Sequence, residues 1–277
     1  MDLLRTIYYK FSPRGRRMAR RIYYFPIDFY ESIFKKKNSM IPPKGKIFIG
    51  SGDFEQQGLH ICDMLTKYAG LNKNSKVLDI GCGIGRVAVP LTNILGECGS
   101  YDGFDIVKDG IDWCNKKIAS KFNNFHFKHI ELKNDLYNLN TEEKAQNFQF
   151  PYPNNSFDCI ILTSVFTHMM PEDVENYLSQ IHRVIKPGGK CLATFFILNE
   201  EISQLMAIGK TYFKFHSFGD YALLDKNVKE ANVAFHEIYL LNIFKENSLN
   251  TTLINRGKWS GNEQGLDFQD VVILEKR

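Results

Sequence analysis

The sequence predicts an α/β protein whose central sheet is doubly wound, with mostly parallel strands. Two observations support this fold class. Between residues 53 and 200, short apolar segments alternate with longer amphipathic segments, which is the pattern of repeated strand–helix–strand units. The first apolar segment runs directly into a turn with glycines at positions 81, 83 and 85, a combination typical of ligand-binding turns in parallel sheets.

The first helix of the alternation is expected after Asp53, because Asp53 and Gln56 form a capping-box pattern and Gly70 provides a stop. Five strands and three further helices are then predicted. The strands cover 76–80, 101–105, 125–130, 157–163 and 190–198, and the helices cover 86–95, 110–122 and 171–185.

The pattern loosens after residue 200. Residues 209–230 have the character of an insertion, and a helix is expected over 234–247. Two final strands, at about 250–257 and 267–275, flank a loop rich in Gly, Asn and Trp. Together with the five earlier strands, they predict a single domain with a seven-stranded sheet.

Composition places the chain among globular proteins. It has 277 residues, of which 44% are hydrophobic and 24% charged, as expected for a protein with a substantial core. No apolar run reaches the roughly 18 residues of a membrane-spanning helix, and the N-terminus lacks the pattern of a secretory signal. A cytoplasmic location is therefore expected. The six cysteines form no C-x-x-C pair, so no metal site is predicted.

The N-terminal segment differs from the rest of the chain in charge. Residues 1–37 contain ten Lys or Arg, three Asp or Glu and nine aromatic side chains. Residues 1–45 are therefore expected to form a basic, aromatic-rich leader, and 46–277 the main domain. The leader is interpreted either as a lid packed on the main domain or as a peripheral membrane contact through residues 1–37. Docking of nucleic acid or protein is a third alternative.

The glycine-rich turn is the strongest functional signal. Gly81, Gly83 and Gly85 allow a tight turn and a close approach of a ligand to the backbone. Asp79 stands two residues before the first glycine. Dinucleotide-binding turns follow the spacing G-x-G-x-x-G, whereas this chain has Arg86 in place of the last glycine. The turn is therefore not expected to hold a pyrophosphate.

Polar side chains follow two other predicted strands. Asp105 ends the second strand, 24 residues after Gly81, where a carboxylate can accept hydrogen bonds from both hydroxyls of a ribose. The turn at 150–158 leads into the fourth strand, which is followed by Phe166 and His168. Carboxyl ends of parallel strands are where open sheets bind ligands.

Taken together, these motifs resemble those of the class I S-adenosylmethionine-dependent methyltransferases. The resemblance rests on D-I-G-C-G-I-G at 79–85, the acidic end of the second strand, P-Y-P-N-N-S-F-D at 151–158 and R-V-I-K-P-G-G at 183–189. It covers roughly residues 50–277. It implies a Rossmann-like sheet whose last strand is antiparallel, with S-adenosylmethionine lying over the ends of the first two strands.

The resemblance also implies roles for single residues. The glycine turn, with Asp79, would contact the methionine half of the cofactor, and Asp105 would hold the ribose. The remaining expected cofactor contacts are Ile106 on the adenine ring, Glu131 near the adenine amino group, and Thr163 and Phe166 at the sulfonium end. Glu131 stands where the family often has Asp.

His168 is the candidate general base, because it follows the fourth strand and imidazole titrates near neutral pH. The alternative is that His168 only forms a hydrogen bond to the loop backbone. Trp259 is interpreted either as lining an acceptor pocket or as a buried structural residue.

The acceptor is expected to be a glycan or another small molecule methylated on oxygen. The Asn/Asp-Pro-Pro motif of amino-methylating nucleic-acid enzymes is absent after the fourth strand. Residues 38–277 carry 25 basic and 28 acidic side chains, which disfavours binding of nucleic acid. Two alternatives stay open, an NAD-dependent dehydrogenase on a similar fold and an inactive methyltransferase-like binding module. The sequence predicts no oligomeric state.

Overall fold

A computed structural model of the chain describes residues 12–35, 38–48, 50, 52–134, 137–139, 141–226 and 228–277. The strands of its main sheet are β1 (Lys76–Ile80), β2 (Ser100–Asp105), β3 (Phe125–His129), β4 (Phe157–Leu162), β5 (Ile185–Phe195), β10 (Leu249–Asn255) and β11 (Asp270–Lys276). A smaller sheet contains β6 (Ile197–Leu198), β7 (His216–Ser217), β8 (Tyr221–Leu223) and β9 (Val233–His236).

The helices connect and cover these strands. They are α2 (Pro13–Phe34), α3 (Phe54–Ala69), α4 (Ala88–Leu91), α5 (Lys108–Cys114), α6 (Pro171–Val184), α7 (Glu200–Ala207) and α8 (Glu237–Glu246). A π-helical turn, η2 (Asn115–Ala119), continues α5. The 3₁₀ turns are η1 (Lys44–Lys46), η3 (Ala145–Asn147), η4 (Phe166–His168), η5 (Lys229–Ala231) and η6 (Lys258–Ser260).

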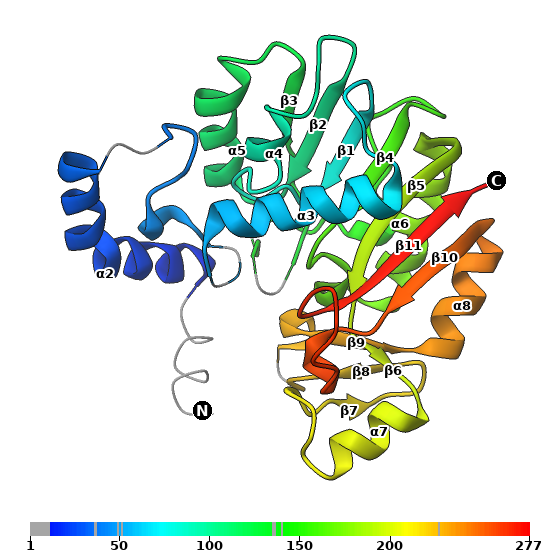
Figure 1. Cartoon of the computed structure of the whole chain (residues 1–277). Helices are drawn as coiled ribbons and strands as arrows, with labels where there is room; N and C mark the ends of the chain where they lie inside the picture. Colours follow the sequence, from blue (N-terminus) through cyan, green and yellow to red (C-terminus); the bar gives the residue numbers. More distant parts are fainter. Residues whose placement is uncertain are drawn as a thin grey trace.

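Within the described residues, the main sheet has seven strands in the order β10-β11-β5-β4-β1-β2-β3 (Figure 1). β11 pairs antiparallel with both β10 and β5, and the other pairs are parallel. The predicted fold class, including the antiparallel last strand, is therefore confirmed.

Alternating side chains divide the core between the two faces of the sheet. Cys159 and Ile161 of β4 pack with α3, α4 and α5, whereas Ile160 and Leu162 pack with α6 and α8. Because both faces are covered by helices, the sheet is doubly wound and its strands are apolar on both sides.

The strand order reverses between β1 and β4. The chain adds β2 and β3 on one side of β1, and then returns to add β4 and β5 on the other side. Connections that leave in opposite directions open a crevice at the carboxyl ends of these two strands. This reversal sets the position of the functional site.

The end signals of α3 act as the sequence predicts. Asp53 accepts a hydrogen bond from the amide of Gln56 at 2.8 Å, and Gly70 ends the helix in the left-handed region with φ 72°.

The helix expected over 86–95 is shorter in the structure. Only Ala88–Leu91 is α-helical, and turns continue to residue 95. A helix that began at Arg86 would need a hydrogen bond from the amide of residue 90 to the carbonyl of residue 86. Residue 90 is proline and has no amide proton, so the regular helix cannot include that turn.

The region after β5 differs most from the prediction. The strand expected over 190–198 starts earlier, at Ile185, and splits after Phe195. The segment from 196 to 236 folds into the smaller sheet together with α7. We call this segment the cap, and it lies below the carboxyl ends of the main strands in Figure 1. The expected helix over 234–247 begins at Glu237, because the preceding residues pair with β8 as strand β9.

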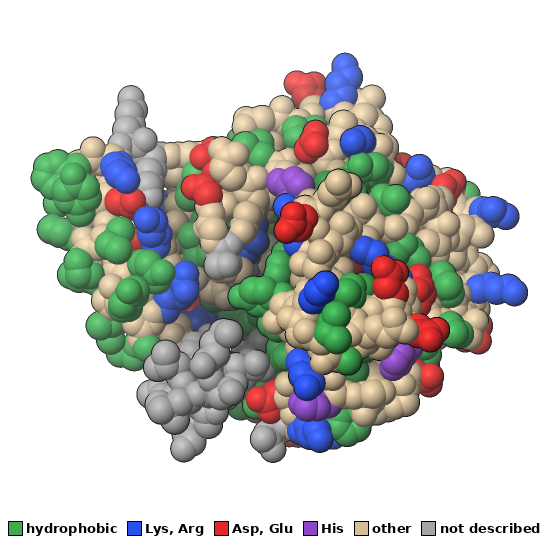
Figure 2. Space-filling model, turned by 60° about the horizontal axis from the view of Figure 1, so that its bottom comes forward, with side chains coloured by type: hydrophobic (Ala, Val, Ile, Leu, Met, Phe, Trp, Pro, Cys, Tyr) green, Lys and Arg blue, Asp and Glu red, His purple; other side chains and the backbone are tan. Residues whose placement is uncertain are grey.

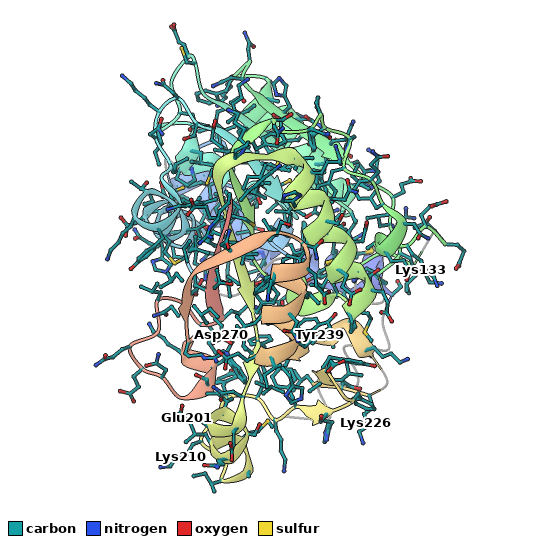
Figure 3. The ribbon with its side chains drawn as sticks, turned by 90° about the vertical axis from the view of Figure 1, so that its right-hand side faces the viewer. Lys133, Glu201, Lys210, Lys226, Tyr239 and Asp270 are labelled. Carbon is teal, nitrogen blue, oxygen red and sulfur yellow. The ribbon has the colours of Figure 1, made fainter. Side chains whose placement is uncertain are left out.

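A buried carboxylate joins the cap to the main sheet. Asp270 starts β11 and accepts hydrogen bonds from the amides of Ile197 (2.6 Å) and Gly257 (2.7 Å) and from Nε1 of Trp259 (3.0 Å). Figure 3 shows Asp270 where the strands of the two sheets meet. The Trp259 side chain is fully buried against Phe196 and Phe215, so the structural interpretation of this tryptophan is confirmed.

The N-terminal helix α2 lies beside the main sheet (Figure 1). Among the described residues, no helix is both long and apolar enough to span a bilayer. The division of the chain into a leader at 1–45 and a domain at 46–277 stays a prediction.

Replacing Asp270 by alanine should lower the free energy of unfolding by about 3 kcal/mol, because three buried donors lose their acceptor. The free energy of unfolding is measured by urea denaturation monitored by circular dichroism. Asp63→Ala, on the exposed side of α3, is the control and should change stability little. Equal stabilities of the two variants would show that Asp270 does not hold the cap in place.

Candidate functional site

A cavity of about 490 Å³ opens at the strand-order reversal. Its floor is formed by the carboxyl ends of β1, β2 and β4, and its opposite wall by the cap and the segment around 132–145. This volume lies within the roughly 300–1,000 Å³ of small-molecule sites. Six predicted site residues line the cavity, namely Asp79, Gly81, Asp105, Ile106, Thr163 and His168.

Asp105 holds the glycine turn in place. Its Oδ2 accepts a hydrogen bond from the amide of Gly83 at 2.8 Å, and its Oδ1 accepts one from the amide of Val107 at 2.7 Å. Burial raises the pKa of Asp105, although the two amides oppose this shift. Each carboxylate oxygen keeps a further lone pair, so Asp105 can accept additional hydrogen bonds from a ligand.

Asp79 is a second buried carboxylate on the cavity wall. The hydroxyl of Tyr101 donates to its Oδ2 at 2.7 Å. Burial raises the pKa of Asp79 to about 7, with the hydrogen bond from Tyr101 acting in the opposite direction. A cation in the cavity would favour the ionised form of this side chain.

Arg86 supplies a positive charge to the same cavity. Its Nη1 donates to Oε1 of Gln57 at 2.6 Å, and its guanidinium lies against Gly50. Burial lowers the pKa of Arg86, and the negative charges of Asp267 and Asp79 counteract this. The sequence analysis noted Arg86 only as the residue that breaks a dinucleotide motif, and its position directly after the turn was the signal for a role in binding.

Four residues predicted as cofactor contacts are not among the described residues that line the cavity. The amide of Gly83 faces Asp105, and a Cβ at Gly85 would lie 2.8 Å from Cδ1 of Ile118, so Gly85 serves helix packing. Glu131 is exposed, and Leu132 forms the wall at that point. The reason is that β3 ends at His129 and the chain then turns outward.

Phe166 is the last of these four residues. Its side chain is fully buried and stacks on Phe195 with ring centroids 4.8 Å apart. The 3₁₀ turn η4 directs Phe166 into the core and leaves His168, two residues later, on the cavity wall.

His168 is held by the cap. Its Nδ1 lies 2.8 Å from the carbonyl oxygen of Glu230 in η5. A carbonyl oxygen can only accept, so this contact assigns the ring proton to Nδ1 and leaves Nε2 as a proton acceptor. Burial lowers the pKa of His168, which keeps the ring neutral at pH 7.

The far wall of the cavity is aromatic. Phe196, Phe213 and Phe268 pack edge to face and line the cavity together. Thr194 and Gln269 add polar groups, joined by a hydrogen bond of 2.6 Å. No local sequence pattern predicts this aromatic wall, because its members come from the cap and from the last loop, which only the tertiary structure brings together.

Comparison with known proteins agrees with this geometry. A family model described as a methyltransferase domain matches residues 78–193. The PH0226 protein from Pyrococcus horikoshii shares the fold with a TM-score of 0.57 and 17% identity, covering 90% of this chain and 99% of that chain. A SAM-dependent methyltransferase from Methanosarcina mazei gives a TM-score of 0.51 and 20% identity, covering 77% and 96%.

Relatives among curated proteins are named for different acceptors. A demethylmenaquinone methyltransferase from Lactobacillus johnsonii is 29% identical over 57% of this chain and 58% of its own. A phosphoethanolamine N-methyltransferase from Plasmodium falciparum is 28% identical over 63% and 53%. A tRNA N(3)-cytidine methyltransferase from Gallus gallus is 26% identical over 45% and 31%. The matched region thus spans less than two thirds of each of these relatives.

Residues 78–193 therefore match a methyltransferase domain, and the sheet that contains them has the fold of the two solved structures. The Methanosarcina mazei neighbour is named as SAM-dependent, in agreement with the cofactor that the sequence predicts. These matches give no support to the alternative of an NAD-dependent dehydrogenase.

The imidazole of His168 should titrate below its ordinary pKa of 6.5. Because the folded state binds this proton more weakly than the unfolded state does, protonation of His168 destabilises the fold as the pH falls below about 6.5. NMR titration of the Cε1 proton measures the pKa, and the signal is assigned by its loss in His168→Gln. A midpoint at or above 6.5 would contradict the burial of a neutral ring.

Proposed function

We propose that this protein transfers a methyl group from S-adenosylmethionine to a hydroxyl oxygen of a small-molecule acceptor. The observation that carries the proposal is that one cavity contains both the Asp105-bound glycine turn and a neutral histidine, His168. Residues suited to bind the cofactor and a residue able to accept a proton thus line the same cavity.

The charges of the cavity suit the amino-acid end of the cofactor. That end carries an ammonium and a carboxylate, and the cavity offers the carboxylate of Asp79 and the guanidinium of Arg86. We assign Asp79 to the ammonium and Arg86 to the carboxylate, since buried charges need partners of opposite sign.

The ribose and the adenine would lie toward β2. Asp105 retains acceptor capacity for two hydroxyls, and Ile106, Val107 and Leu132 form an apolar wall beside it. The set of donors, acceptors and apolar surface present in the cavity therefore matches the chemical groups of the cofactor.

When bound, S-adenosylmethionine supplies an electrophilic methyl group on a sulfonium. The residues of this chain have to position the acceptor hydroxyl and remove its proton. His168 can take this proton on Nε2, while the Glu230 carbonyl stabilises the resulting charge through Nδ1–H.

The aromatic wall supports the narrower assignment to a glycan. Phe213 and Phe268, backed by the buried Phe196, provide apolar surface for the C–H face of a sugar, while Asp267 and Gln269 provide groups for its hydroxyls. The relatives named above act on quinones, phosphoethanolamine and tRNA according to their names, so these acceptors are the competing assignments.

Asp105→Ala should weaken binding of S-adenosylhomocysteine about 100-fold, because two charged hydrogen bonds to the ribose are lost. Isothermal titration calorimetry measures the affinity. The affinity of Asp105→Asn should lie between those of the wild type and of Asp105→Ala. Asp112→Ala, an exposed change on α5, is the control. If NADH raises the melting temperature and S-adenosylhomocysteine does not, the cofactor assignment is wrong.

His168→Gln should lower kcat roughly 100-fold with little change in cofactor affinity, as for loss of a general base. Turnover is measured as S-adenosylhomocysteine release with sugars, quinols, phosphoethanolamine and tRNA as acceptors. His126→Gln, at an exposed position of β3, is the control. Unchanged turnover would show that His168 is only structural, whereas release with none of the acceptors would favour an inactive binding module.

A further inference from the structure

The helix α2 presents its polar side to the protein. Arg17 and Arg21 contact the carboxylate of Asp109 at 3.5 and 3.1 Å. Asp28 accepts hydrogen bonds from the amides of Lys44 and Gly45 at 2.7 and 2.9 Å. One turn further, Glu31 is buried and pairs with Lys35 and Lys44. The contact between α2 and the rest of the chain is thus largely made of charged groups.

The opposite side of α2 is apolar and faces outward. Nine large side chains on this outer face have exposed fractions between 41% and 74%. They are Met18, Ile22, Tyr23, Phe25, Ile27, Phe29, Tyr30, Ile33 and Phe34. Figure 2 shows hydrophobic side chains gathered on the side of α2 that points away from the body, with basic side chains between them and the body.

This arrangement is the reverse of an ordinary surface helix. A helix on a water-soluble protein normally turns its apolar stripe toward the core and its charges toward solvent. In α2 the apolar residues cover roughly half of the circumference at 3.6 residues per turn, and they follow one another along the whole helix. A patch of this extent marks a surface that another apolar phase covers.

The apolar outer face of α2 does not line the cavity. Of the described residues that line the cavity, those N-terminal to α3 are Phe48 and Gly50, and none belongs to α2. Five of the six aromatic side chains of α2 are exposed instead of packed on the methyltransferase body, and Tyr24 is half-buried. The arrangement therefore differs from the lid that the sequence allowed.

Charge and composition indicate what kind of surface covers the outer face of α2. Residues 1–37 carry ten basic and three acidic side chains, and exposed Arg14 and Lys35 stand at the two ends of α2. Interfacial helices combine an aromatic face with Arg and Lys at its border, which attract anionic headgroups. Tyrosines such as Tyr23 and Tyr30 suit the same interface, because the ring is apolar and the hydroxyl stays hydrated.

A second copy of the chain fits this face less well. Two copies joined through this face would bring together two segments 1–37, each with an excess of seven positive charges, and like charges repel. A helix–helix contact also covers only a narrow stripe, whereas a lipid surface can cover the whole outer face.

We propose that α2 docks this protein on an anionic membrane surface, with its nine apolar side chains inserted at the headgroup level. This inference goes beyond the proposed methyl transfer and does not depend on it, since it rests on residues outside the cavity.

Co-sedimentation of the full chain with vesicles tests this proposal. The protein should bind vesicles of phosphatidylcholine and phosphatidylglycerol at least about tenfold more tightly than phosphatidylcholine alone, and the difference should shrink with salt. The triple variant Ile22→Gln, Phe25→Gln, Phe29→Gln should lose at least about tenfold in partitioning, because it removes apolar area while keeping helix propensity and charge.

The matched control is Ile208→Gln, Ile238→Gln, at two exposed apolar positions outside α2, which should bind vesicles as the wild type does. Circular dichroism checks that both variants are folded, and binding of S-adenosylhomocysteine by both separates this test from that of the proposed function. Absence of vesicle binding at low salt would overturn the proposal. So would light scattering showing a wild-type dimer that the triple variant converts to monomer, because the face would then be covered by a second copy.

Discussion

The carboxylate of Asp105 organises the site by binding the glycine turn after β1 and the turn after β2 together. Its two oxygens accept hydrogen bonds from the amides of Gly83 and Val107, which belong to neighbouring parallel strands. A buried carboxylate with two backbone donors is held in one orientation. The crevice left by the strand-order reversal therefore becomes a surface of defined shape, with Asp79, Gly81 and Ile106 arranged around it.

The second half of the site depends on the cap. Asp270 accepts a hydrogen bond from Ile197 of this segment and two more from Gly257 and Trp259 in the loop between β10 and β11. The cap in turn places the carbonyl of Glu230 against His168. The tautomer of the candidate base is thus set by a part of the chain that the common sheet does not include. One structural neighbour with a TM-score of 0.54 is named a [4+2]-cyclase, which illustrates that this fold supports more than one reaction and that the side chains of the site decide the chemistry.

Charge is distributed unevenly along the chain, and the leader is its basic part. Basic residues are concentrated in residues 1–37, whereas acidic residues predominate in the rest. Asp109, on α5, is one of the residues through which the two parts meet, by its contacts with Arg17 and Arg21. Because these charged groups occupy the inner side of α2, its aromatic side chains are left on the outer side. The polarity of the helix is therefore a consequence of how it is attached.

The sequence by itself determined the main sheet, most of its helices and the placing of Asp79, Gly81 and Asp105 at the carboxyl ends of β1 and β2. Apolar alternation, the glycine turn and Asp105 are local patterns, and neighbouring residues or short strand–helix units are enough to express them. Local patterns did not determine the direction of side chains within a turn. Phe166, in the 3₁₀ turn η4, is therefore buried in the core, which the sequence did not predict. They also did not predict that Glu131, which follows the end of β3, lies on the surface. The aromatic wall, the Glu230 contact of His168 and the outward face of α2 were decided only by the tertiary structure, because each joins segments far apart in the sequence whose pairing depends on burial and charge in three dimensions.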